Sequence, residues 1–240
     1  MMLTKLSAAA LGVALAYGGI PAAMAYDTAT VSQTGSFNDA VVEQSDNNGA
    51  SASVTSSGDG NDAYISQQYA TNTGATISTF GDYNDSVIVQ QGVTNAHATV
   101  YQASSHDDAT IDQSGSWNWY HGYLQGQNLT ATINQNGGWG GNTAWVTQDG
   151  HNATATINQY GWQNDAGILQ SGHGGAWDTA SISQSGSKND GYIKQDGKDL
   201  YAAITQQGYG NEAVVLQQGN GYSATVSQTG FMNNAYVNQH

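Results

Sequence analysis

Histidine and acidic side chains are the residues of this sequence whose types could support catalysis or metal binding. The histidines do not recur at a fixed spacing, and no serine, histidine and aspartate follow the spacing of a known hydrolase. Solenoid enzymes that cleave polysaccharides need a cationic or carboxylate cluster on a groove, and the sequence contains no arginine. We therefore expect no enzyme, no catalytic residue and no cofactor. The six histidines are His97, His106, His121, His151, His173 and His240.

Acidic turns offer a second chemistry, which is calcium binding. The turn GDGNDAY at residues 58–64 is similar to the G-x-G-x-D turn of nonapeptide calcium-binding repeats. The equivalent turns GSFND at 35–39 and GDYND at 81–85 lack the second glycine. We therefore expect no metal site, and a secreted monomeric solenoid that binds calcium or a glycan is the alternative function.

These turns also place an aspartate at the same position in successive repeats. The four residues are Asp39, Asp62, Asp85 and Asp108. Strands that stack about 4.8 Å apart would set these carboxylates above one another, and each neighbouring pair would repel by about 0.9 kcal/mol in water. We predict that they act as gatekeepers that slow polymerisation.

A repeat with the pattern A-x-[VI]-x-Q-x-G-x-x-N-x-A-x-[VI]-x-Q positions these residues. Each repeat holds two segments that alternate strictly and are separated by turns with glycine and asparagine, which predicts strand, turn, strand, turn. Alternation gathers Ala, Val or Ile, and Gln on one face. Stacked repeats can bury these faces between two sheets, so we predict an all-β, two-sheet β-solenoid with cross-β geometry. The repeats start at Ala29, Ala52, Ala75, Ala98, Ala131, Ala155, Ala180, Ala202 and Ala224.

Glutamines and asparagines would stack in this fold on identical residues one layer above and below. A stacked amide both donates and accepts, so a column of amides can satisfy its own hydrogen bonds inside the core. The predicted glutamine ladder is Gln33, Gln44, Gln67, Gln90, Gln102, Gln113, Gln135, Gln148, Gln159, Gln170, Gln184, Gln195, Gln206, Gln217, Gln228 and Gln239. The predicted asparagine ladder, at the bend, is Asn38, Asn61, Asn84, Asn142, Asn164, Asn189, Asn211 and Asn233.

The repeat is irregular near its middle. SGSWN, which follows Gln113, is similar to a turn within a repeat, and the next candidate strand, at 121–125, comes one residue late. We interpret this as an extra half-unit, with a phase slip near 113–126 and about nineteen short strands in all. Loop insertions are expected at 137–141 and 171–177. All six tryptophans lie between Trp117 and Trp177, where they either pack on one another in loops or bind a glycan by stacking.

The N-terminus has the order of segments that is typical of a secretory signal peptide. Lys5 precedes an apolar run at 6–20, and Ala23-Met24-Ala25 follows. We predict a leader at residues 1–25 and one domain at 26–240. The mature chain would lack proline and cysteine, so disulfides cannot stabilise it. Three lysines and 18 acidic residues would give it a net charge of 3 − 18 = −15, which disfavours nucleic acid as a partner.

The repeats resemble those of the curlin family, the subunits of bacterial curli amyloid fibres. The family's Gln-x-Gly-x-x-Asn-x-Ala motif, followed four residues later by Gln, stands here as QTGSFNDAVVEQ (33–44), QYGWQNDAGILQ (159–170), QQGYGNEAVVLQ (206–217) and QTGFMNNAYVNQ (228–239). The resemblance implies a secreted subunit that polymerises at the cell surface into a fimbrium and supports adhesion and biofilm matrix. It also implies a nucleator subunit and an outer-membrane secretion channel as partners, and scarce Lys and Arg make the chain more similar to the major subunit.

The ends of the repeat array favour polymerisation over a soluble monomer. The first repeat starts four residues after the predicted cleavage site, and the last runs to one residue from the C-terminus. We expect open strand edges at both ends, which would let one molecule stack on the next without closure. An ice-binding face would need a regular outward T-x-T array, which Thr28 and Thr30 begin and later repeats are not expected to keep.

Overall fold

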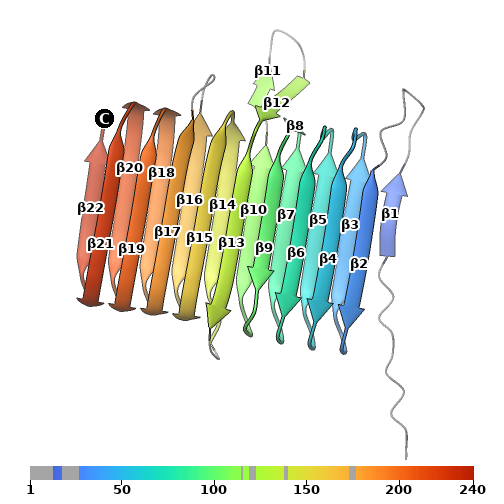
Figure 1. Cartoon of the computed structure of the whole chain (residues 1–240), viewed down its shortest axis with the longest axis horizontal. Coiled ribbons are helices and arrows are strands. Elements are labelled where there is room, and N and C mark those ends of the chain that lie inside the picture. The colour runs from blue at the N-terminus through green and yellow to red at the C-terminus, as the bar shows by residue number, and fades with distance from the viewer. Residues whose placement is uncertain (1–12, 18–26, 115, 119–122, 138–139, 173–176) are drawn as a thin grey trace, which may run out of the picture.

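The chain alternates between two parallel β-sheets that wind into a β-solenoid (Figure 1). The computed structural model describes residues 13–17, 27–114, 116–118, 123–137, 140–172 and 177–240, and the regular elements within them are all strands. One large sheet has ten strands and the other has nine. The predicted all-β, two-sheet solenoid is therefore confirmed, and the two large sheets together hold nineteen strands.

The strands of the two large sheets alternate along the chain between one sheet and the other. The nine-stranded sheet contains, in spatial order, β2 (Thr28–Thr34), β4 (Ser51–Ser57), β6 (Gly74–Phe80), β9 (His97–Gln102), β13 (Thr130–Gly137), β15 (Ala153–Trp162), β17 (Asp178–Ser187), β19 (Tyr201–Tyr209) and β21 (Ser223–Phe231). The ten-stranded sheet contains β1 (Val13–Tyr17), β3 (Asp39–Ser45), β5 (Asp62–Gln68), β7 (Asp85–Gln91), β10 (Asp108–Ser114), β14 (Thr143–Gly150), β16 (Asp165–Gly172), β18 (Asp190–Lys198), β20 (Glu212–Asn220) and β22 (Asn234–Gln239). A small third sheet contains β11 (Ser116–Asn118), β12 (Tyr123–Gln127) and β8 (Val93–Thr94).

Equivalent residues of the repeat lie side by side in each sheet. In the nine-stranded sheet Ala29 pairs with Ala52 and Val31 with Val54, and the same register reaches Ala224. A slip of one residue would turn every Ala and Val of a strand to the solvent face, because side chains alternate with a period of two. The apolar pattern of the repeat therefore fixes the register of the sheets.

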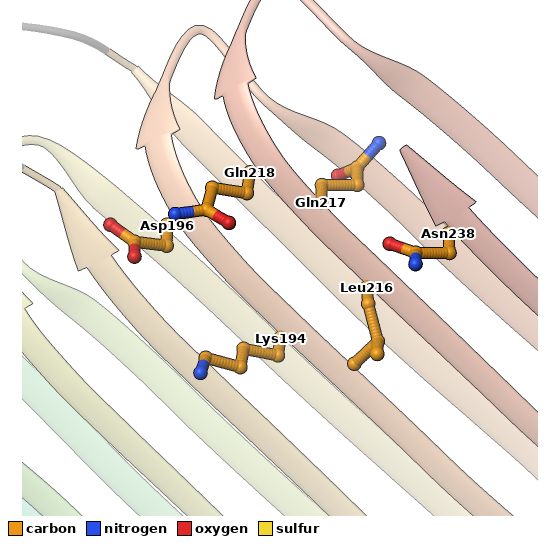
Figure 2. Close-up of a pocket in the computed structure, with 6 residues that line it drawn as sticks. All are labelled: Lys194, Asp196, Leu216, Gln217, Gln218 and Asn238. Atoms are coloured by element: carbon orange, nitrogen blue, oxygen red, sulfur yellow. The ribbon is translucent and has the colours of Figure 1, made fainter. Parts of the chain in front are cut away.

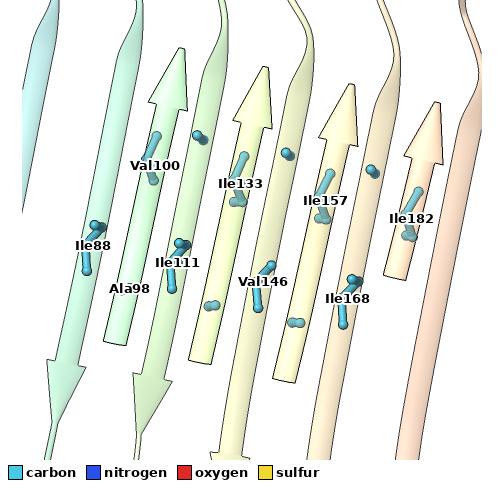
Figure 3. Packing of buried hydrophobic residues seen from close by; sticks show 14 of the residues in the cluster. Ile88, Ala98, Val100, Ile111, Ile133, Val146, Ile157, Ile168 and Ile182 are labelled. Atoms are coloured by element: carbon cyan, nitrogen blue, oxygen red, sulfur yellow. The ribbon is translucent and has the colours of Figure 1, made fainter. Parts of the chain in front are cut away.

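The core is a thin layer of alanine and β-branched residues between the two sheets. Figure 3 shows Ile88, Ile111, Val146 and Ile168 of the ten-stranded sheet facing the layer that contains Ile133 and its neighbours. All of these side chains are fully buried. Burial of one Val or Ile side chain stabilises a fold by roughly 1.5–3 kcal/mol, so each layer adds stability only when a neighbouring layer covers it.

Glycines allow the layers to approach closely at the bend before the asparagine column. Gly58 has a φ of 126°, and a Cβ placed on it would collide with the carbonyl group of Gly81 in the next layer. Only glycine accepts both this conformation and this contact. The bend can therefore stack at the spacing of the strands.

The predicted half-unit and phase slip near 113–126 are wrong. β9 pairs with β13, which sets Gln102 beside Gln135, and β10 pairs with β14, which sets Gln113 beside Gln148. The inserted segment instead forms the antiparallel pair β11 and β12, and β12 also pairs with β8. Direct pairing of β10 with β14 keeps the alanine, β-branched and glutamine columns continuous, whereas an intervening strand would interrupt them. His121 lies outside the described residues.

The chain returns from this insertion through a small second core. Leu129 is fully buried there with Ala70, Val93, Ala96 and Ala153. Leu129 precedes β13 as Ala96 precedes β9, so its burial sets the start of β13 and restores the register. Of the other two predicted insertions, 137–141 is described except for residues 138–139, and 171–177 except for residues 173–176.

Strand β1 comes from the segment that the sequence predicts as a leader. It pairs in parallel with β3 and sets Val13 beside Val41 and Tyr17 beside Ser45. β1 therefore covers the edge of β3 at the N-terminal end of the ten-stranded sheet (Figure 1). Across the described part of the chain, no helix is long and apolar enough to span a membrane.

Candidate functional site

The described residues contain no group of three or more His, Cys, Asp or Glu side chains arranged to hold a metal ion. A shallow groove of 290 Å³ lies on the outer face of the ten-stranded sheet, between β18, β20 and β22 (Figure 2). Its lining contains one cation, Lys194, and one carboxylate, Asp196, among Leu216 and amide side chains. This lining contains no serine, threonine or cysteine nucleophile, and the candidate functional features are instead the side-chain ladders and the sheet ends.

Glutamines form a continuous ladder inside the ten-stranded sheet. Each Nε2 donates to the Oε1 of the glutamine in the next layer toward the C-terminus, over 2.7–3.0 Å, and all but the terminal Gln239 are buried. Because the side chain that donates to one neighbour accepts from the other, the buried amides satisfy one another. The ladder runs through Gln44, Gln67, Gln90, Gln113, Gln148, Gln170, Gln195, Gln217 and Gln239.

The nine-stranded sheet carries a shorter glutamine ladder with the same direction. It runs through Gln102, Gln135, Gln159, Gln184, Gln206 and Gln228, with Nε2 to Oε1 distances of 2.9–3.0 Å. Gln33 stands apart from it, because its neighbours in register are Ser56 and then Thr79, whose hydroxyl groups are too short to reach the next layer. Gln33 Nε2, Ser56 Oγ and Thr79 Oγ1 are buried without a hydrogen-bond partner.

The glutamines also join the two sheets. Gln135 Nε2 donates to the backbone carbonyl of Asp108 on the opposite sheet, at 2.9 Å, and Gln148 Nε2 donates to the carbonyl of Thr130, at 3.0 Å. Each glutamine is therefore held to its own sheet by the ladder and to the other sheet by a backbone bond. Loss of one amide would leave buried polar groups unpaired on both sides.

An asparagine ladder follows the bend, with the opposite direction. Asn61 donates from its backbone N and from Nδ2 to Asn38 Oδ1, both at 3.0 Å, and Asn84 does the same to Asn61. The pattern resumes at Asn142 and continues through Asn164, Asn189, Asn211 and Asn233. The donors of this ladder face the N-terminal end of the solenoid, whereas those of the glutamine ladders face the C-terminal end.

Asp107 occupies the position of the asparagine ladder between Asn84 and Asn142, and the sequence-based prediction of the ladder omitted it. Its backbone N donates to Asn84 Oδ1 at 2.9 Å, and its Oδ1 accepts from Asn142 N and Nδ2 at 2.8 and 3.2 Å. Its Oδ2 contacts Ser104 Oγ. Burial raises the pKa of the Asp107 carboxyl above its ordinary value of 3.8, against the lowering effect of these hydrogen bonds. Alignment of HDDATIDQ with YNDSVIVQ would have placed Asp107 in the asparagine column.

The four predicted gatekeeper aspartates lie next to one another on the solvent face of the ten-stranded sheet. Asp39 pairs with Asp62, Asp62 with Asp85, and Asp85 with Asp108. Desolvation and then the neighbouring carboxylates raise the pKa values of Asp62, Asp85 and Asp108. At Asp62, Asp85 and Asp108 the carboxyl group therefore binds a proton more readily than an isolated aspartate does.

The carboxylate column extends beyond the predicted aspartates. After Thr143 it continues with Asp165, Asp190 and Glu212, and it ends at the uncharged Asn234. The pKa values of Asp165 and Asp190 are raised, chiefly by desolvation. An acidic residue directly after the repeat asparagine, as in NDAGI, NDGYI and NEAVV, is the sequence feature that marks these three positions.

The described tryptophans do not form one cluster. Trp145 lies on β14 and extends over Gly167 to Tyr192, with ring centroids 5.8 Å apart. Trp162 lies 5.8 Å from Lys188 Nζ, and Trp177 is exposed. Trp119 and Trp139 lie outside the described residues, as does the side chain of Trp117. The tryptophan side chains that the structure describes are thus spread over different layers of the solenoid.

Among the described strands, those at the ends of the solenoid have a neighbour on one side only. β2 and β21 bound the nine-stranded sheet, and β22 bounds the ten-stranded sheet opposite β1. Along these strands the unpaired backbone groups, the apolar column and the terminal amides of the ladders lie together. This arrangement can bind a further strand that repeats the same pattern.

Comparisons with known proteins agree with this geometry. No curated protein matches the chain. The sequence matches the Curlin associated repeat at residues 175–208 and 197–230, which spans β17 to β20 and most of β21. These repeats, on a β-solenoid with two parallel sheets, support an assignment to the curlin family.

Proposed function

We propose that the chain is the structural subunit of an extracellular, curli-like amyloid fibre, and that it self-assembles by end-to-end stacking of solenoids. The observation that carries this proposal is the match between the strands at the two ends of the molecule. β22 carries Ala235, Val237 and Gln239 where β3 carries Ala40, Val42 and Gln44. β21 on one molecule is likewise complementary to β2 on the next.

The ladders give the junction a direction. Glutamine amides donate toward the C-terminal end, so Gln239, whose Nε2 makes one bond to the Ser223 carbonyl, can use its second N–H to bind Gln44 of the next copy. The asparagine ladder donates the other way, so Asn38 of that copy can donate to Asn233 Oδ1. Both ladders continue only in a head-to-tail contact. Such a heterologous contact does not close and therefore gives a fibre.

Electrostatics favours the same junction. Asn234 of β22 would lie beside Asp39 of the next copy, so the junction adds an amide to the carboxylate column in place of a further like charge. Within each subunit the column of Asp39, Asp62, Asp85 and Asp108 opposes stacking. We propose that these residues slow assembly until the chain has left the cell.

Export and cleavage fit this scheme. Removal of residues 1–25 takes away β1, which frees the edge of β3 for β22 of a neighbour. The fibre is expected at the cell surface, where it would support adhesion and biofilm matrix, with a nucleator subunit and an outer-membrane secretion channel as partners. This part of the proposal rests on the curlin repeats.

Refolding of the mature chain tests the proposal. After dilution from denaturant we expect thioflavin fluorescence to rise and aligned fibres to diffract at about 4.8 and 10 Å, the strand and sheet spacings. A chain that stays monomeric and soluble would contradict fibre assembly. It would favour the alternative, a monomeric solenoid that binds calcium or a glycan.

A further inference from the structure

The two outer faces of the solenoid differ sharply in charge. Each of the nine strands of the nine-stranded sheet turns three residues outward at positions equivalent to Thr28, Thr30 and Ser32, and all are described. Threonine or serine fills 20 of these 27 positions, and none is Asp, Glu, Lys or Arg. The equivalent 27 positions of β3 to β22 hold nine carboxylates and Lys194.

We infer that the face of the nine-stranded sheet, here called the hydroxyl face, is where two solenoids pack side by side, each presenting this same face. The chain has a net charge of −14, so contact between two copies is opposed by repulsion over most of the surface. Contact through the ten-stranded sheets would bring two carboxylate columns together. Contact through the hydroxyl faces brings no carboxylate of one face against the other, so this is the face at which charge opposes contact between two copies least.

The dimensions of the hydroxyl face suit such a contact. Nine strands spaced about 4.8 Å apart, each offering about 16 Å of length, give roughly 700 Å² per copy, close to the roughly 800 Å² per partner of a stable interface. In a fibre this area repeats with every subunit, so the contact is multivalent. Short hydroxyl side chains and threonine methyl groups can interdigitate as in a steric zipper.

Aromatic residues on the same face support association. Phe80, Tyr101, Tyr160 and Tyr201 are between 38% and 50% exposed there, and Phe80 and Tyr101 contact each other with ring centroids 5.8 Å apart. Three of the four stand at or near the ends of their strands, so the middle of the face stays flat. A partner that covers the face would remove this apolar surface from water.

The test uses a matched pair of variants in the mature chain. Thr132→Glu with Thr156→Glu charges two adjacent residues of the hydroxyl face, whereas Thr110→Glu with Thr147→Glu adds the same charge to the ten-stranded sheet in neighbouring layers. Thr132→Lys with Thr156→Lys repeats the first change while lowering the net negative charge. Mass per length of the fibres, from scanning transmission electron microscopy, gives the number of solenoids across a fibre.

Fibres of the wild type and of the Thr110→Glu, Thr147→Glu control should have twice the mass per length of fibres of the Thr132, Thr156 double variants. This holds whether the double variants carry Glu or Lys. Wild-type fibres with the mass of a single solenoid, or loss of pairing in the control, would overturn the inference. Single wild-type filaments that sediment with crystalline cellulose, when the Thr132/Thr156 variants do not, would assign the face to a polysaccharide and also overturn it. The fibre measurement rests on the proposed function, so absence of the reflection at about 4.8 Å would count against that function. Fibres that show this reflection but have the mass of a single solenoid would count against the pairing alone.

Discussion

At the level of single residues, Asp107 replaces an amide of the asparagine ladder by a carboxyl group. The neighbouring asparagines each donate from Nδ2 to the Oδ1 of the preceding layer, as Asn84 does to Asn61. An ionised Asp107 has no such donor, and burial raises its pKa. The ladder therefore lacks one amide bond at this layer, where Asp107 Oδ2 contacts Ser104 Oγ instead, and ionisation of Asp107 is opposed by its desolvation.

Asp107→Asn should stabilise the solenoid at pH 7 by about 1 kcal/mol, because it restores the missing donor and removes the buried charge. A raised native pKa means that the cost of ionisation is complete above that pKa and disappears as the pH falls toward the ordinary value of 3.8. The gain should therefore shrink between pH 7 and about pH 4. Urea unfolding at both pH values measures it, and an equal gain at both would contradict this account of Asp107.

Neutral residues in the carboxylate column should shorten the lag of fibre growth severalfold. Replacement of Asp39, Asp62, Asp85 and Asp108 by Asn removes neighbouring charges that repel by about 0.9 kcal/mol per pair in water. Because the pKa values of Asp62, Asp85 and Asp108 are raised, a lower pH should shorten the lag as the replacements do. The repulsion is complete above these pKa values and fades below them, so wild-type lag should shorten as the pH falls from 7 toward 3.8.

Thioflavin fluorescence reports the lag, and a matched control separates position from net charge. Asp62→Asn with Asp85→Asn removes two charges from the column, whereas Asp46→Asn with Asp199→Asn removes two from bends outside it. Both bend residues have a positive φ, which Asn tolerates. An unchanged lag in the fourfold variant, or an equal effect of the bend control, would contradict a gatekeeper role.

At the level of strands, the nine-stranded sheet lacks amides in two successive layers. Ser56 and Thr79 occupy the glutamine positions of β4 and β6, and their hydroxyl groups are buried without partners. The ladder of that sheet is therefore continuous only from Gln102 onward. The N-terminal layers depend more on the ladder of the ten-stranded sheet, which remains intact from Gln44.

Ser56→Gln with Thr79→Gln should complete the shorter ladder. The two positions share the register of Gln102, so each new amide can bond to its neighbours, and stability should rise by about 1 kcal/mol per restored bond. Ser53→Gln with Thr76→Gln, on the same strands but facing outward, should change stability by less than about 0.5 kcal/mol. Equal urea midpoints for wild type and the inward pair would contradict the account of the ladder.

The inserted pair β11 and β12 should be dispensable for the solenoid. Deletion of residues 117–126 leaves five residues between Ser114 and Thr130, as many as connect Ser45 to Ser51. A shorter closed loop offsets the lost pairing of β12 with β8, so we expect stability to change by less than about 1 kcal/mol. Circular dichroism and urea unfolding check this, and a chain that fails to fold would show that the insertion is part of the solenoid.

The sequence predicted the fold because every repeat carries the same inward residues, and it failed where pairing partners had to be chosen. Tyr123–Gln127 has the local sequence of a strand. β10 pairs directly with β14, which leaves no place for this strand between them in the ten-stranded sheet, and the sequence does not show that pairing. The hydroxyl face was missed for a different reason. The predicted repeat pattern is defined by the inward residues, whereas the outward Thr and Ser share a residue class without a fixed identity at each position. Asp107 escaped because the column was predicted from asparagine alone, and this layer carries a carboxyl group at that position.

At the level of the whole molecule, the solenoid is built of layers that each need a neighbour, and its two ends carry matching strands. Stability therefore increases with every added layer, whether the layer belongs to the same chain or to the next. Strand β1 covers one of these ends, so removal of the proposed leader would free the same edge of β3 that the proposed assembly uses. The central claim is that β22 of one subunit pairs with β3 of the next.

Cross-linking between two single-cysteine variants tests that claim most directly, since the wild-type chain has no cysteine. Glu43→Cys lies on β3 and Asn238→Cys on β22, at opposite ends of one solenoid and side by side only across the proposed junction. In fibres grown from an equal mixture, a short thiol cross-linker should give dimers of one variant with the other. Fibres of either variant alone should give none. Cross-links within a single variant, or their absence from the mixed fibres, would contradict head-to-tail stacking.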